Sequence, residues 1–69
     1  MGRRQFQEGD RVRARESQAR VKAAMIGTVV RVFIVLDDTY EVQFDDLAFR
    51  SIIDGTALEL VSQDYALVD

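Results

Sequence analysis

The stretch Thr39-Tyr-Glu-Val-Gln-Phe-Asp45 decides the fold of this 69-residue chain. Its apolar side chains, Tyr40, Val42 and Phe44, alternate with polar ones, which is the period of a strand with one face in a core and the other in water. A second aspartate, Asp46, follows the stretch and ends the alternation. We therefore expect a strand over residues 39–45 that buries its aromatic face.

Short segments on either side of this stretch show the same strand character. In residues 10–15, Val12 and Ala14 alternate with three arginines, which predicts a half-buried strand with the arginines on its wet face. Residues 49–53 and 58–61 predict two more short strands, separated by an Asp-Gly turn. Together these segments predict an all-β domain of about five strands.

Residues 26–36 predict the longest strand, because they are dense in β-branched side chains. Gly27 near its start indicates a bulge or a sharp bend. Asp37 and Asp38 then supply a hairpin turn. Strand alternation would place Val29, Arg31, Phe33 and Val35 on one face, and Val30, Val32, Ile34 and Leu36 on the other.

Residues 16–25 interrupt the alternation and are rich in good helix formers. An isolated helix of this length is marginal in water, so we expect a long loop with one helical turn, pinned by Val21 or Met25. Short, closely spaced strands in a chain of this length most commonly close into a small barrel, and we expect Phe6 in the lead-in to tuck against its end. We also expect the tail to pack on the domain through Tyr65, Leu67 and Val68.

The composition predicts one domain over residues 1–69, with its core in about residues 8–61. Cysteine, histidine, tryptophan and proline are absent, which removes disulfides, thiolate metal sites and the usual general base. No apolar stretch approaches the ~20 residues that span a bilayer, and no secretory signal is evident. We expect a cytoplasmic protein without a cofactor. We also expect no enzyme activity, because no serine or threonine has a visible base.

The net charge of −3 conceals a polarised sequence. Residues 1–31 carry eight arginines and lysines against three acidic residues, whereas residues 32–69 carry one arginine against nine acidic residues. Such asymmetry indicates a polarised surface. Two interpretations follow: the basic half pairs with the acidic half within the fold, or the arginines form a contact surface for a partner.

The strand segments resemble those of the SH3-like small barrels, a superfamily that includes KOW and Tudor modules, plasmid-borne trimethoprim-resistant dihydrofolate reductases, and small accessory subunits of photosynthetic electron transfer. The resemblance covers residues 8–61 and implies a small barrel of about five strands. It does not select one activity, because the fold hosts many. The segments that carry it are Gly9-Asp-Arg-Val-Arg13, Gly27-Thr-Val-Val-Arg-Val32, Tyr40-Glu-Val-Gln-Phe-Asp45 and Leu58-Glu-Leu-Val61.

Each family implies a different use of the barrel. The reductases share the opening segment, but their Val-Gln-Ile-Tyr active-site strand is absent here. A Tudor module needs an aromatic cage for a methylated cation, whose walls here would be Phe33, Tyr40, Phe44 and Phe49. KOW modules imply binding to RNA or to ribosomal and polymerase proteins. The electron-transfer subunits imply a docking piece for an acidic redox protein.

We expect a non-catalytic binding module that docks on a protein partner through a basic and apolar face. The alternative is KOW-like RNA binding through the arginine stripe. We expect no membrane contact, and either a monomer or a weak homodimer. The predicted contact residues are Arg11, Arg13, Arg15, Arg20, Lys22, Arg31, Phe33 and Val35.

Overall fold

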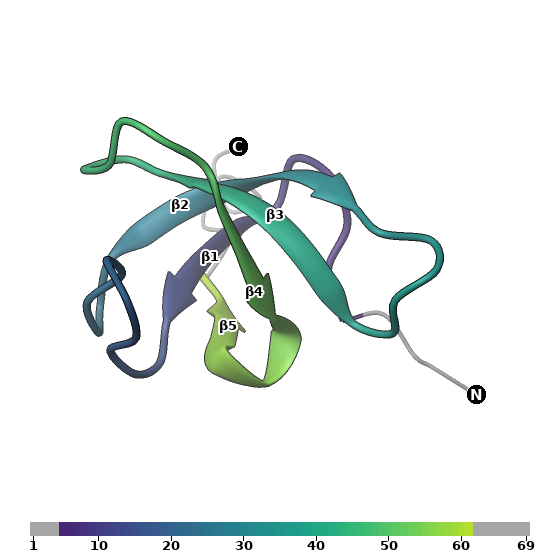
Figure 1. Cartoon of the computed structure of the whole chain (residues 1–69), viewed down its shortest axis with the longest axis horizontal. Coiled ribbons are helices and arrows are strands. Elements are labelled where there is room, and N and C mark those ends of the chain that lie inside the picture. The colour runs from purple at the N-terminus through teal and green to yellow at the C-terminus, as the bar shows by residue number, and fades with distance from the viewer. Residues whose placement is uncertain (1–4, 62–69) are drawn as a thin grey trace, which may run out of the picture.

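The computed structural model describes residues 5–61, which form a single antiparallel sheet and one short 3-10 turn (Figure 1). The order across the sheet is β4-β3-β2-β1-β5, so β4 and β5 are its edges. The prediction of an all-β domain of about five strands is confirmed. The elements are β1 (Arg11–Ala14), β2 (Ile26–Val32), β3 (Thr39–Phe44), β4 (Ser51–Asp54), the 3-10 turn η1 (Gly55–Ala57) and β5 (Leu58–Leu60).

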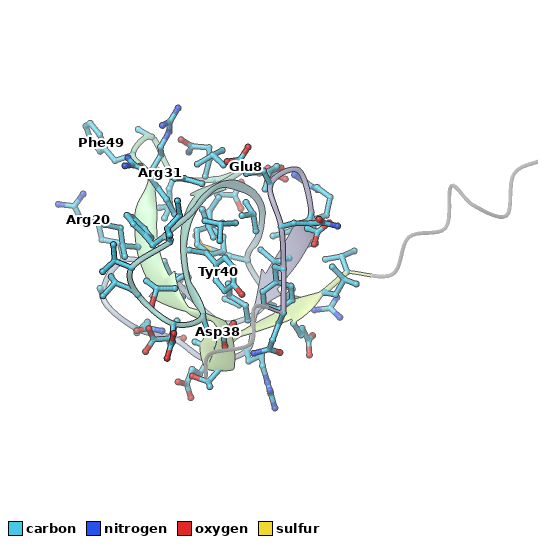
Figure 2. The ribbon with its side chains drawn as sticks, turned by 90° about the vertical axis from the view of Figure 1, so that its right-hand side faces the viewer. Glu8, Arg20, Arg31, Asp38, Tyr40 and Phe49 are labelled. Atoms are coloured by element: carbon cyan, nitrogen blue, oxygen red, sulfur yellow. The ribbon has the colours of Figure 1, made fainter. Side chains whose placement is uncertain are left out.

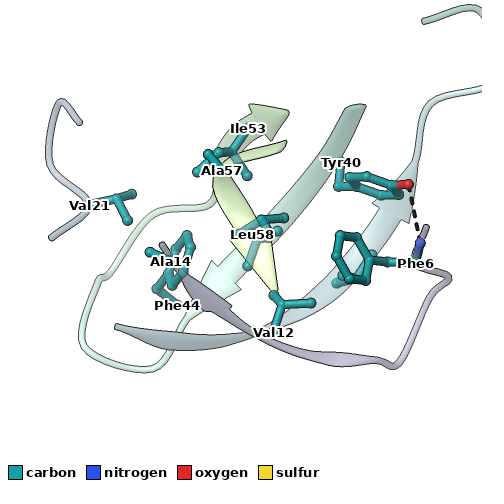
Figure 3. Close-up of a cluster of buried hydrophobic side chains, with 11 residues drawn as sticks. Phe6, Val12, Ala14, Val21, Tyr40, Phe44, Ile53, Ala57 and Leu58 are labelled. Carbon is teal, nitrogen blue, oxygen red and sulfur yellow. Dashed lines mark hydrogen bonds between the residues drawn. The ribbon is translucent and has the colours of Figure 1, made fainter. Parts of the chain in front are cut away.

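The core gathers on one face of the sheet, around β3 (Figure 3). Tyr40, Val42 and Phe44 are fully buried, as their alternation predicted. From β1, Val12 and Ala14 face the same interior, so the predicted alternation of that strand is also confirmed. The arginines between them lie on the opposite, outer face of the sheet.

β1 pairs with both β2 and β5, which places the first and last strands side by side. Ala14 lies opposite Leu58, and Leu58 is buried. Leu60 is 49% exposed, so Leu58 is the residue of β5 that fills the core. This pairing places acidic Glu59 directly opposite Arg13.

β2 is shorter than predicted, because it ends at Val32 rather than at residue 36. Its register with β3 shifts between Val29 and Arg31, so the alternation changes phase after buried Val29. The predicted division of residues 29–36 into two strand faces is therefore wrong. Residues 33–36 belong to the loop that joins β2 to β3.

At Gly27, where a bulge or a sharp bend was predicted, β2 and β3 instead approach each other closely. The register shift lies further along β2, between Val29 and Arg31. A Cβ at Gly27 would lie 2.6 Å from the carbonyl oxygen of Gln43 and 2.7 Å from the Cα of Phe44. Both are backbone atoms of the neighbouring segment, which cannot move aside cheaply. Only glycine lets β2 and β3 come this close.

The loop over residues 15–25 contains no helical turn, contrary to the expectation from its composition. Ala19 and Ala24 instead have positive φ, and Gln18 and Val21 exchange two backbone hydrogen bonds of 2.8 Å. Val21 is buried and Met25 packs partly against the core, so the predicted anchoring of this loop is confirmed. The tail predicted to pack through Tyr65, Leu67 and Val68 lies outside the described residues.

The Tyr40 hydroxyl fastens the lead-in segment to the open end of the core. It accepts hydrogen bonds from the backbone N–H groups of Gln5 (2.8 Å) and Phe6 (3.2 Å), and it donates one to the Asp38 carboxylate. Phe6 is buried and packs edge-on against the Tyr40 ring at 5.3 Å between centroids. The expected tucking of Phe6 is thereby confirmed, although only as part of this polar network.

Asp38 completes the network from the turn before β3. Its carboxylate also accepts a hydrogen bond from the Gln5 side chain at 2.7 Å, and its carbonyl accepts one from the Gly55 N–H at 2.8 Å. Burial raises the pKa of Asp38, but the hydrogen bonds from Tyr40 and Gln5 outweigh it, so the net pKa is lowered. Burial and the same Asp38 hydrogen bond raise the pKa of Tyr40.

The lowered pKa of Asp38 predicts a pH-dependent stability. Because the carboxyl is held below its ordinary pKa in the folded state, its contribution is complete above about pH 4 and is lost as the pH falls through the lowered value. Asp38→Asn removes the charge, and asparagine tolerates the φ of +51° found at this position. Urea unfolding at pH 7 should therefore show a destabilised variant, and the gap to the wild type should shrink toward pH 3.

Asp37→Asn is the matched control, since it changes the neighbouring aspartate of the same turn. It should leave the free energy of unfolding close to that of the wild type at both pH values. A gap between Asp38→Asn and the wild type that is equally large at pH 7 and pH 3 would show that the carboxylate charge contributes nothing.

Candidate docking surfaces

The outer face of the sheet carries the predicted arginines, and the structure pairs the first of them with a carboxylate. Arg11 donates two hydrogen bonds to the Asp45 carboxylate, at 3.1 and 2.7 Å, and a third to the Thr28 hydroxyl at 2.8 Å. The bond to Asp45 raises the pKa of Arg11 and lowers the pKa of Asp45. This bidentate geometry is the strongest arrangement that the two groups can form.

Other outward-facing arginines also lie near carboxylates, but none of them in the bidentate geometry of Arg11. Arg13 lies 2.6 Å from Glu59, as the register of β1 and β5 requires. Arg31 and Arg50 both lie 3.8 Å from the Glu41 carboxylate, which stands between them on β3. Pairs this exposed contribute little to stability, but they reduce the positive charge available to a partner.

Three predicted cations lie in or beside the 15–25 loop. Arg15, Arg20 and Lys22 are exposed, and none of them forms an ion pair within residues 5–61. The charge asymmetry of the sequence is thus resolved in two ways: internal pairing across the sheet, and cations left open at one loop.

The apolar part of the predicted surface lies in the loop between β2 and β3, which we call the hairpin tip (residues 33–36). Ile34 is 85% exposed, Val35 90% and Leu36 51%. Phe33 is half-buried, and its ring centroid lies 5.2 Å from the guanidinium carbon of Arg31. The hairpin tip therefore presents consecutive apolar side chains to water beside a cation.

The structure does not gather the predicted contact residues on one face. The loop holding the hairpin tip projects at one end of the molecule, on the right of Figure 1, whereas the 15–25 loop lies at the other end. The paired arginines of β1 lie on the sheet between them. The sequence analysis predicted that Phe33 and Val35 lie beside the arginines of residues 11–15, because it continued the strand alternation past Val32.

A second candidate surface was missed by the sequence prediction. A groove, which we call the β4 groove, runs between the loop residues Gln18–Val21 and residues 50–53 at the start of β4. Arg20 projects from its loop side and Arg50 belongs to the β4 side. Figure 2 shows Arg20 and Phe49 on the same side of the molecule, and Phe49 is 71% exposed. Only the folded topology brings these residues together.

Comparison with protein-family models, with curated proteins and with solved structures finds no match for this chain. Within the described part of the chain, no group of three or more acidic side chains is placed to hold a metal ion. No helix in residues 5–61 is long and apolar enough to cross a membrane. The function must therefore be argued from the surfaces alone.

The internal pairing of Arg11 yields a direct prediction. Arg11→Gln removes the bidentate partner of Asp45, so the pKa of the Asp45 carboxyl should rise toward its ordinary value. A pH titration followed through the side-chain carboxyl carbon by NMR measures this change. Arg15→Gln, on the same strand side but without an ion pair in residues 5–61, should leave the Asp45 titration unchanged. An unaltered Asp45 titration in Arg11→Gln would contradict the pairing.

Proposed function

We propose that this protein is a non-catalytic binding module that docks on a protein partner through the hairpin tip and the adjoining Arg31. The observation that carries the proposal is the exposure of three consecutive apolar side chains, Ile34, Val35 and Leu36, at 85%, 90% and 51%. Of the predicted contact residues, Arg31, Phe33 and Val35 belong to this surface. Arg11 and Arg13 of β1 form ion pairs on the outer face of the sheet, so we leave them out of the proposed contact surface.

The chemistry of the tip suits a protein interface. Fully burying a valine, leucine or isoleucine side chain contributes about 1.5–3 kcal/mol, so a partner that covers the tip gains substantially. Interface centres are enriched in aromatic residues and arginine, and Phe33 lies beneath the Arg31 guanidinium. The same guanidinium can pair with a carboxylate of the partner.

We further propose that the sheet curls into an SH3-like small barrel, as the sequence resemblance implies. Two observations support it. The edge strands β4 and β5 are joined by the single turn η1, and the N–H of Arg15, just past β1, donates to the Ala57 carbonyl at 2.8 Å. Such a barrel would serve as a rigid base for the projecting tip. We also propose a cytoplasmic location.

Protein docking is favoured over the alternative of RNA binding. Arg11 and Arg13, two of the six predicted cations, already donate hydrogen bonds to carboxylates at 2.7 and 2.6 Å. Phosphate groups would have to displace those carboxylates before counterion release could drive binding. The exposed side chains of the tip are mainly aliphatic and offer few faces on which bases could stack.

The proposal predicts that one exposed substitution abolishes docking without affecting the fold. Val35→Asp places a charge in the centre of the tip, where the side chain has almost no contacts to lose, so stability should change by no more than about 0.5 kcal/mol. In pull-downs from a lysate of the native host, proteins retained by the wild type should be lost with Val35→Asp. Quantitative mass spectrometry of nuclease-treated samples measures this loss.

Leu60→Asp is the matched control, because Leu60 is an exposed leucine on β5 outside the tip. It should retain the same proteins as the wild type. Loss with both variants, or with neither, would contradict docking through the tip. Disappearance of the retained proteins on nuclease treatment alone would favour the RNA alternative. Sedimentation over a concentration range shows whether the retained partner is a second copy of the chain.

A further inference from the structure

The outer edge of β4 is open to an additional strand. The sheet ends at β4, which pairs with β3 on one side, and none of residues 5–61 pairs with its other side. In an antiparallel pair, alternate backbone N–H and C=O groups of each strand point away from the partner. An edge of this kind is a ready template for an extended peptide.

The β4 groove lies along this edge. Its far wall is the loop Gln18–Val21, whose backbone bonds are closed within the loop by the mutual pairing of Gln18 and Val21. Buried Val21 and Ile53 also line the groove. The loop therefore faces β4 across the groove without consuming the backbone groups of its edge.

The charged side chains that line the β4 groove are both cations. Arg20 and Arg50 line it, and no carboxylate does. Arg50 shares its nearest carboxylate, Glu41, with Arg31 at 3.8 Å, and Arg20 has no ion pair within the described residues. The chain has a net charge of −3, but the lining of the β4 groove carries two positive charges and no negative one.

The apolar side chains at this edge complete the chemistry. Ile52 is 66% exposed and Phe49 is 71% exposed. Arg50 and Ile52 are two residues apart, so they face the same side, and a strand added beside β4 would bring its own alternate side chains next to them. An acidic residue of the added strand could pair with Arg50, and an apolar residue could pack on Ile52.

We infer that the β4 groove binds an extended acidic peptide segment of a protein partner, which adds to the sheet along β4. This site is separate from the hairpin tip, so it does not depend on the proposed docking function. Backbone pairing along β4 favours a peptide over single-stranded nucleic acid, which has no ladder of N–H and C=O groups to offer.

The test uses a synthetic fluorescein-labelled decapeptide in which pairs of glutamates alternate with pairs of valine or isoleucine residues, so that each face of the extended peptide presents acidic and apolar side chains in turn. Titrated into the ¹⁵N-labelled full chain, it should shift the amide signals of residues 51–54 and 18–21 and leave those of residues 34–36 unchanged. Fluorescence anisotropy should show binding that weakens at higher salt. Absence of shifts at residues 51–54 up to millimolar peptide would overturn the inference.

Paired peptides and variants separate the two components of the site. A peptide with lysine in place of glutamate tests charge, and one with proline at two central positions tests strand pairing; neither should bind. The double variant Arg20→Ser and Arg50→Ser should weaken binding about tenfold or more, whereas Val35→Asp should bind as the wild type does. Equal binding of the proline peptide, or tighter binding of an oligouridylate that displaces the decapeptide, would contradict the assignment.

The outcomes also distinguish the two proposals. If Val35→Asp loses partners from the lysate while the decapeptide fails to bind, the hairpin tip stands and the β4 groove falls. If the decapeptide binds and Val35→Asp changes nothing in the lysate, the reverse holds. Both arginines are exposed, so the variant is expected to fold, and its amide spectrum provides the check.

Discussion

The buried face of β3 is the constraint on which the rest of the structure depends. Tyr40, Val42 and Phe44 are each fully buried, and a strand cannot bury one face without turning the intervening side chains to the other. Phe44 also lies opposite Gly27 on the neighbouring strand β2, where no side chain fits. The Tyr40 hydroxyl extends the same buried row into a polar network that holds the lead-in segment.

The burial of these side chains also determines which side chains of β3 lie on the outer face of the sheet. Glu41 faces out because its neighbours face in, and it lies near Arg31 of β2 and near Arg50, the residue just before β4. Ion pairs across the sheet neutralise the charge on its outer face and leave the exposed apolar and cationic side chains at its two ends. One end presents the aliphatic hairpin tip, and the other presents the cations of the 15–25 loop beside an edge of β4 with which none of residues 5–61 pairs (Figures 1 and 2). The two proposed contact surfaces therefore lie at opposite ends of the domain.

Much of the fold could be predicted from the sequence, because period-two alternation is a local signal. It identified β1 and β3, the burial of Tyr40 and the anchoring of the loop by Val21. It failed on β2, since the register shift after Val29 is set by pairing with β3, and residues 33–36 look like a continued strand. The β4 groove could not be predicted either, because Arg20 and Arg50 are thirty residues apart and only the sheet topology makes them neighbours.

Amide hydrogen exchange of the full chain, followed by NMR, tests this account most directly. Because β3 lies between β2 and β4, the amides of residues 41–43 are bonded to one neighbour or the other and should be among the slowest to exchange. The amides of Val35 and Leu36, in the projecting tip, should exchange far faster. Protection of residues 35–36 equal to that of β3 would mean that β2 continues through the tip. Rapid exchange throughout residues 41–43 would mean that β3 is not an interior strand of the sheet.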